Sequence, residues 1–471
     1  MTTMIDQSLS VDDVSDLIAD AFDWGIHLAG FYELRHVYTG LEGQPAYRGL
    51  NRLQPILDLF DAKVRIATTV NASTLYSGGM FDLSNDPVVI EAPGVADGRY
   101  WSIQALGPNI DWFFMAGSQF TGNGPQRYVI VGPRWRGLLP AGFAGTEVVR
   151  SPSDAFVLTV RVAVTSRTEQ DLAGARAAVT GVRAAPLSLW HAGGGRVPDL
   201  VDQPIVKSDY ATFPRMDLIA DIGKSMTAID YLQLLSLVIN DPSMTRRSDS
   251  VKEREALANL ARLGLRPGTC FDPSQITDEQ REVIDRGFAR ARTDARQAFE
   301  KTQVDMSGWK LQSSLFYDDL DYRAKAGAND VAWGTPVPFQ SHTIGYLFDD
   351  AEGFPLDGAN CYTITFDVED LPPVTEFWEL PVYDSQGYFI ENSENRYSAT
   401  SYLARAGEYA VRDGKLTFYL QAERPSDSDL ARNWLPVSAT DGFQIAARFY
   451  GPLAQLIDGT YPMPPVVRAG A

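Results

Sequence analysis

The sequence predicts an α+β protein, mainly β, in which two jelly-roll or sandwich-like β domains are joined by a helical segment and preceded by an N-terminal helix. Residues 63–186 and 309–471 contain short apolar runs separated by turn dipeptides such as Asp97-Gly98 and Asp413-Gly414, a pattern typical of sandwich or barrel strands. Residues 1–62 and 187–308 carry apolar side chains at helical spacing instead. The length of 471 residues also exceeds the roughly 250–300 residues over which one core grows.

The N-terminal segment predicts one amphipathic helix from about Val11 to Leu34. Ser10 and Asp13 have the spacing of a capping box, with Asp in place of the usual Glu. The apolar positions that follow recur every three or four residues: Leu17, Ile18, Ala21, Phe22, Gly25, Ile26 and Ala29.

The first β domain is predicted from five apolar runs between turns: Pro87 to Glu91, Arg99 to Leu106, Trp112 to Met115, Arg127 to Val131 and Phe156 to Val164. An Ala-rich stretch from Glu169 to Val182 then predicts a helix. Together these elements place the first domain boundary near residue 186.

The middle third is predicted to be helical. One apolar stripe comprises Leu218, Ile219, Ile222, Met226, Ile229 and Leu232. A second helix is expected from about Thr277 to Thr302, because Thr277 and Gln280 form a capping box. The second β domain is then predicted from five runs: Tyr362 to Phe366, Phe377 to Tyr383, Gly387 to Ile390, Leu416 to Leu420 and Phe443 to Tyr450.

Composition excludes several classes of partner. A net charge of −19 would repel a phosphate backbone, so no nucleic-acid partner is expected. No apolar stretch approaches the about 18 residues needed to cross a bilayer, and the N-terminus lacks the features of a secretory signal. We therefore expect a cytoplasmic protein with no membrane partner, and Cys270 and Cys361 suit a reducing compartment without a disulfide framework.

The four histidines, at positions 27, 36, 191 and 342, do not have the spacing of a metal site. No dinucleotide or phosphate-binding glycine motif is present either, since Gly122-x-Gly124 lacks the third glycine and the following helix. The sequence thus predicts no metal and no cofactor.

Two groups of short motifs resemble a bacterial family that pairs two modules in one chain. The first group resembles the N-terminal module, domain of unknown function twelve fifty-four, and includes Asn71-Ala72-Ser73-Thr74-Leu75-Tyr76-Ser77, Phe81-Asp82-Leu83, Asp97-Gly98-Arg99-Tyr100 and Thr121-Gly122-Asn123-Gly124. The second resembles domain of unknown function twelve fourteen and includes Pro355-Leu356-Asp357-Gly358, Leu371-Pro372-Pro373-Val374, Asn395-Arg396-Tyr397 and Asp458-Gly459-Thr460-Tyr461. The resemblance implies two β-rich, jelly-roll-like domains joined by helices and implies no particular reaction. The family often has Asp where Ser73 stands and Arg where Gln119 stands.

Candidate site residues come from polar groups on aromatic and β-branched strands, because burying such groups requires partners. The candidate binding residues are Asn71, Thr74, Arg99, Tyr100, Trp112, Tyr383, Asn395 and Arg396. The guanidinium groups of Arg99 and Arg396 are suited to bind an anion. The candidate general acids or bases are Tyr76, His342 and Tyr397. A structural network that fixes strand register or the domain junction explains the same residues and stays open beside a ligand cleft.

The sequence leaves three functions open. The first is a cofactor-independent enzyme that hydrolyses a small organic molecule, or eliminates a group from it, in a cleft of one β domain or at their junction. The second is a non-catalytic protein that binds a small molecule or carbohydrate. The third is an assembly module, since exposed sheet edges favour a homo-oligomer.

Overall fold

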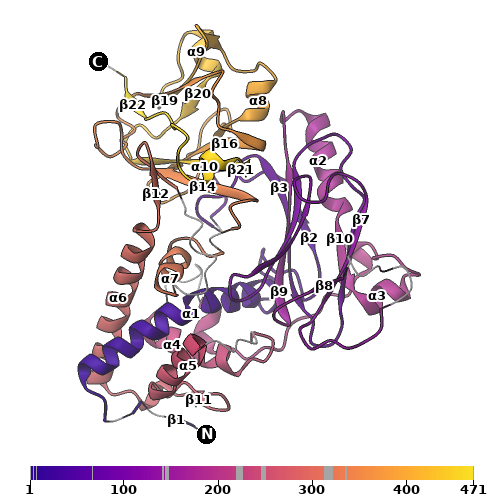
Figure 1. Ribbon diagram of the computed structural model, residues 1–471, viewed down its shortest axis with the longest axis vertical. Helices are drawn as coiled ribbons and strands as arrows, with labels where there is room; N and C mark the ends of the chain where they lie inside the picture. Colours follow the sequence, from indigo (N-terminus) through magenta and orange to yellow (C-terminus); the bar gives the residue numbers. More distant parts are fainter. Residues whose placement is uncertain are drawn as a thin grey trace.

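The protein was analysed as a computed structural model that describes residues 2–3, 5–6, 8–65, 67–139, 143, 148–218, 226–244, 251–311, 322–334 and 337–469. Two β modules and a helical layer make up the fold (Figure 1). The second β module lies at the top of that view, the first at the right and the helices at the lower left, with α6 running up toward the second module. The predicted α+β class, with an N-terminal helix and helices between two β regions, is confirmed.

Helices within the described residues have these bounds: α1 Val11–Thr39, α2 Glu169–Gly181, α3 Leu187–Ala192, α4 Ala228–Asn240, α5 Val251–Arg262, α6 Asp278–Glu300, α7 Tyr322–Val331, α8 Ser401–Arg405, α9 Ser428–Arg432 and α10 Ala454–Ile457. Both capping boxes are confirmed, with Ser10 and Asp13 starting α1 and Thr277 and Gln280 starting α6. Helix α1 continues one turn beyond the predicted end, to Thr39. Of the predicted stripe, Ile219 and Ile222 lie outside the described residues, while Ile229 and Leu232 belong to α4.

The first β module contains two sheets with a shared core. One sheet has the order β2-β3-β9-β5-β6 and the other β10-β4-β7-β8. Their strands are β2 Gln54–Ile56, β3 Thr74–Asp82, β4 Val88–Ala92, β5 Trp101–Leu106, β6 Trp112–Gly117, β7 Gln126–Val131, β8 Val148–Arg150, β9 Ala155–Ala163 and β10 Arg183–Pro186. Leu75 and Val160 of the first sheet and Ile90 and Ile130 of the second belong to one buried cluster, so the sheets pack face to face.

The second β module repeats this two-layer plan. One sheet has the order β12-β13-β14-β21-β16-β17, and the other the order β18-β19-β15-β22 with β20 beside β19. Their strands are β12 Val304–Met306, β13 Trp309–Leu311, β14 His342–Leu347, β15 Tyr362–Asp367, β16 Val374–Asp384, β17 Ser398–Thr400, β18 Val411–Arg412, β19 Lys415–Gln421, β20 Trp434–Pro436, β21 Phe443–Pro452 and β22 Val467–Arg468. The predicted strand from Gly387 to Ile390 is wrong, since the chain forms only an isolated bridge there, between Tyr383 and Phe389.

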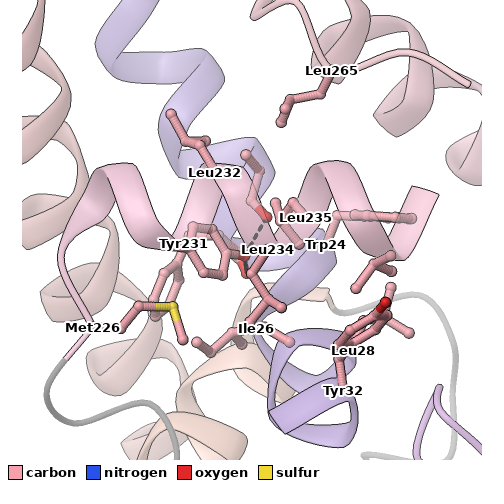
Figure 2. Packing of buried hydrophobic residues seen from close by; sticks show 14 of the residues in the cluster. Trp24, Ile26, Leu28, Tyr32, Met226, Tyr231, Leu232, Leu234, Leu235 and Leu265 are labelled. Carbon is pink, nitrogen blue, oxygen red and sulfur yellow. Dashed lines mark hydrogen bonds between the residues drawn. The ribbon is translucent and has the colours of Figure 1, made fainter. Parts of the chain in front are cut away.

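The helical layer packs around α1. Gly25 of α1 allows α4 to come close, because a Cβ at this position would lie 2.5 Å from Leu235 Cδ2. The Tyr231 hydroxyl donates to the carbonyl of Ala21 at 2.7 Å at the same contact. Figure 2 shows Tyr231 and Leu235 of α4 beside α1. The short parallel pair of β1 Thr2–Thr3 with β11 Cys270–Phe271 lies at the edge of this layer. Among the described helices, none is long and apolar enough to cross a membrane.

Candidate functional site

Strand alternation places polar side chains on the outer face of the β3-β9-β5 sheet. Successive side chains of a strand point to opposite faces. Val160 and Val162 of β9 point into the module core, so Arg161 between them points out. Tyr76 of β3 follows the core residue Leu75 and is paired in register with Arg161, so it shares that outer face.

The β14-β21-β16 sheet of the second module presents a matching face. Ile445, Ala447 and Phe449 of β21 point into that module's core. Arg448 and Tyr450 therefore point the other way, and the register places Arg448 opposite Glu379 of β16 and Tyr450 opposite His342 of β14. We call Asn71, Tyr76, Arg161, His342, Glu379, Arg448 and Tyr450 the junction cluster.

Direct contacts join the two faces. The Asn71 side-chain nitrogen donates to Glu379 Oε2 at 2.6 Å and to the Tyr450 hydroxyl at 2.8 Å, across more than 300 residues of sequence. The Ala72 amide donates to Glu379 Oε1 at 3.2 Å. The Tyr100 ring lies 5.0 Å from the Tyr450 ring, centroid to centroid. The cluster is thus a polar seam between the two β modules, and Figure 1 shows β3 next to β21 at this seam.

His342 is buried in this seam with an open hydrogen-bonding position. Its side chain is 4% exposed and its ring stacks on Tyr450 at 5.1 Å. Within the described residues, its Nδ1 atom has no hydrogen-bond partner. A buried polar atom without a partner costs about 1–3 kcal/mol, so such an atom indicates either strain or a place for a ligand.

The seam keeps contact with solvent on one side. Tyr76, Arg161 and Tyr346 are half-buried, whereas Glu379 and Tyr450 beside them are buried. Phe60 stacks on the Tyr76 ring at 5.5 Å, and the Arg161 guanidinium lies 5.5 Å from the centroid of the same ring. The tyrosine side is therefore the part of the cluster that solvent contacts.

Burial controls the protonation of the cluster. It lowers the pKa of His342 well below the usual value, and the positive charges of Arg161 and Arg448 lower it further, so the imidazole is neutral at neutral pH. Burial also raises the pKa of Glu379 and raises the pKa of Tyr450 well above its usual value. The cluster therefore combines a neutral imidazole, a protonated phenol and two guanidinium groups.

Two buried histidines predict a loss of stability in mild acid. Burial lowers the pKa of His27 as well, and Lys325 adds to the effect. Below the unfolded pKa of about 6.5 the unfolded chain takes up protons that the folded chain excludes, so stability falls as the pH falls. From about pH 7 to about pH 5.5, the two histidines together should remove about 2–3 kcal/mol from the free energy of unfolding. Urea titrations at both pH values check this, and a His27→Gln, His342→Gln double variant should lose less stability than the wild type over that interval. An equal loss in both proteins would contradict the assignment.

A separate pocket of about 530 Å³ lies beside the seam. Its wall includes Phe60, Ala72, Arg167, Asn395 and Tyr397. Arg167 donates to the carbonyls of Ala72 and Asn395 at 2.9 and 3.1 Å, so its guanidinium ties the two modules together at the pocket wall.

The predicted site residues divide into four groups, three of which lie at or beside the seam. Asn71, Tyr76 and His342 belong to the junction cluster. Thr74, Tyr100 and Tyr383 surround it, since Thr74 donates to Asn71 at 2.9 Å, the Tyr100 ring packs on Tyr450, and the Tyr383 hydroxyl donates to the carbonyl of Val70 at 2.7 Å. Asn395 and Tyr397 lie at the neighbouring pocket, where the Tyr397 hydroxyl donates to Asn395 at 3.1 Å.

The remaining three predicted residues lie elsewhere. Arg99 forms ion pairs with Asp97 at 2.6 Å and Asp171 at 3.1 Å, and it thereby links the segment before β5 to α2. Arg396 donates to the carbonyls of Ala431, Arg432 and Trp434 and pairs with Glu394 at 3.4 Å. Trp112 packs against the helical core. Neither arginine has a free face for an anion, because carboxylates and carbonyls occupy it.

Sequence reasoning missed Arg161 and Arg448 as site residues. Both interrupt apolar runs that were read as strands, and a charged residue at the outward position of such a run is a usable signal. Ser73 lies beside Glu379 and is buried, so the position where the family often has Asp is part of the seam. Among the described residues, no group of three His, Cys, Asp or Glu side chains is placed to hold a metal ion.

Comparisons with known proteins agree with this two-module plan. The model for a protein of unknown function, DUF1254, matches residues 50–186, and the model for a protein of unknown function, DUF1214, matches residues 342–454. No curated protein matches the chain. The structure of the VPA0106 protein from Vibrio parahaemolyticus has a TM-score of 0.67 at 22% identity, over 97% of this chain and 100% of that one. A protein from Burkholderia cenocepacia has a TM-score of 0.43 at 12% identity, over 98% of this chain and 95% of that one. The first likeness shows a shared fold.

Proposed function

We propose that this chain, which belongs to the family that pairs a DUF1254 module with a DUF1214 module, is a cofactor-independent enzyme that acts on a small organic molecule at the junction of its β modules. The observation that carries the proposal is His342, a neutral imidazole whose Nδ1 has no partner among the described residues and whose ring stacks on Tyr450, in the same seam as the half-buried Tyr76.

The chemistry follows from the groups present. A neutral imidazole is suited to accept a proton, and a phenol is suited to donate one. In an elimination, His342 would take a proton from carbon while the leaving group departs with the bonding electron pair and receives a proton from Tyr76. In a hydrolysis, His342 would take a proton from a water whose oxygen bonds to the acyl carbon, and the leaving group would depart with the electron pair of the broken bond and a proton from Tyr76. Arg161 and Arg448 would stabilise the negative charge that develops in either reaction.

A panel of candidate substrates tests the proposal. Small esters, amides and hydroxy acids are incubated with the protein in D₂O, and proton NMR follows product formation and deuterium uptake at carbon. We expect turnover of at least one class, and a loss of about 100-fold or more in His342→Gln and Tyr76→Phe, because a general acid or base contributes about that factor.

His191 supplies the matched control, because it is exposed and lies in α3, away from the seam. The His191→Gln protein should keep the full rate, and circular dichroism should show that the two seam variants fold. Turnover that survives in folded His342→Gln would overturn the assignment. Absence of turnover across the panel would favour a protein that only binds its ligand.

A further inference from the structure

Two guanidinium groups from facing sheets lie in the seam that contains His342. Arg161 belongs to β9 of the first module and Arg448 to β21 of the second. Both act electrostatically on His342 and on Tyr76. Two like charges held near one imidazole repel each other, and this arrangement is costly in a region shielded from water unless an anion lies between them.

No carboxylate of the described residues forms an ion pair with either group, although Glu379 and Arg448 interact electrostatically. Neither Arg161 nor Arg448 has an ion pair within 4 Å among these residues, whereas the buried Arg35 pairs with Asp241 at 2.5 Å. Glu379 is the cross-strand neighbour of Arg448, but its oxygens accept from Asn71 and Ala72.

The hydrogen bonds of the two arginines also favour an anionic ligand. Arg448 is 7% exposed and donates to the carbonyl of Thr69, while its Nε atom has no partner among the described residues. Arg161 donates to the amide oxygen of Gln104, a neutral group. Guanidinium groups favour carboxylates, which accept two parallel hydrogen bonds from one fork.

The aromatic side chains that line the seam indicate the chemistry of the uncharged part of the ligand. The rings of Tyr76 and Tyr346 are half-buried, and Tyr346 stacks with the exposed Phe348 at 6.3 Å. Such rings offer apolar surface at a low cost in conformational entropy and pack well on flat apolar groups.

Building on the proposed function, we propose that the substrate is a small carboxylate whose charged group lies between Arg161 and Arg448 and whose apolar body packs on Tyr76 and Tyr346. This inference concerns binding, so it can be tested without turnover.

Isothermal titration calorimetry with benzoate, benzamide and phenylphosphonate tests the inference. We expect benzoate to bind in a 1:1 ratio and the isosteric but neutral benzamide to bind at least about 10-fold more weakly, since charge-assisted hydrogen bonds are stronger than neutral ones. Arg161→Gln and Arg448→Gln should each weaken benzoate binding by about 10- to 100-fold. Tighter binding of phenylphosphonate than of benzoate would overturn the choice of a carboxylate.

Arg412→Gln is the matched control, because Arg412 is exposed and pairs only with Asp427 and Asp429 among the described residues. It should bind benzoate as the wild type does. If Arg161→Gln fails to fold, Arg161→Lys keeps the charge without the fork and should bind benzoate more weakly than the wild type. Equal binding of benzoate and benzamide, or no benzoate binding at millimolar concentration, would overturn the inference. Charge-selective binding without turnover would instead refute only the enzymatic proposal, and turnover of neutral compounds without charge selectivity would refute only this inference.

Discussion

Replacing Glu379 by alanine is expected to lower the free energy of unfolding by about 4 kcal/mol, because the change strands two buried donors and opens a cavity. The Glu379 side chain is fully buried, and it accepts from Asn71 and from the Ala72 amide across the module junction. The Asn71 side chain would keep only its bond to the Tyr450 hydroxyl, and the bond from the Ala72 amide would be lost. Urea titration followed by tyrosine and tryptophan fluorescence measures the loss.

The Glu379→Gln variant shows how much of the stability depends on the charge of Glu379 and how much on its hydrogen bonds. Burial raises the pKa of Glu379, because the charged form is less favourable away from water, and glutamine keeps the size of the side chain without the charge. The Gln variant should lose about 1–3 kcal/mol, less than the Ala variant, because one acceptor oxygen remains while the other donor faces the new NH₂ group. If the Gln variant were as unstable as the Ala variant, the negative charge of Glu379 would have to hold the seam together.

Gly327→Ala is expected to destabilise the helical layer by about 3 kcal/mol, because overpacking against a rigid neighbour forces helices apart. A Cβ at Gly327 in α7 would lie 2.0 Å from the carbonyl oxygen of Ala295 in α6. The obstacle is backbone, which cannot turn aside as a side chain can. The melting temperature and the urea midpoint both report the effect.

Gly287→Ala in α6 is the matched control. Its Cβ would meet Ser15 and Ile18 at 3.2 and 3.3 Å, contacts that a small shift relieves. Alanine also gains about 0.5–1 kcal/mol of helix stability over glycine, so this variant should stay within about 1 kcal/mol of the wild type. Equal stability of the Gly327 and Gly287 variants would mean that α6 and α7 can separate freely.

The sequence patterns predicted the elements that carry strong local signals. Ser10 and Thr277 started their helices as expected, and the apolar runs containing Arg161 and Arg448 form β9 and β21. Strand β3 carries a weaker signal, because Gly78 and Gly79 interrupt its alternation. The strand containing Tyr76 was accordingly visible only as a motif.

The site was harder to predict because it depends on which sheet faces meet. Asn71, Tyr76 and His342 were found as polar groups that need partners, and they do share one seam. Arg99 matched the same description, yet its partners Asp97 and Asp171 are supplied locally by its own module. Strand alternation gives the face on which a side chain lies, but it does not give the element that covers that face.

The bond from Asn71 to Tyr450 spans 379 positions of the chain, so the seam has consequences for how the protein matures. Loop closure over such a distance carries an entropic penalty and comes late in folding. During synthesis, the first module must leave the ribosome with Arg161 and Tyr76 still uncovered, and it acquires its partner surface only when the final hundred residues or so have emerged. The contacts between the two modules should therefore form after the secondary structure in a refolding experiment.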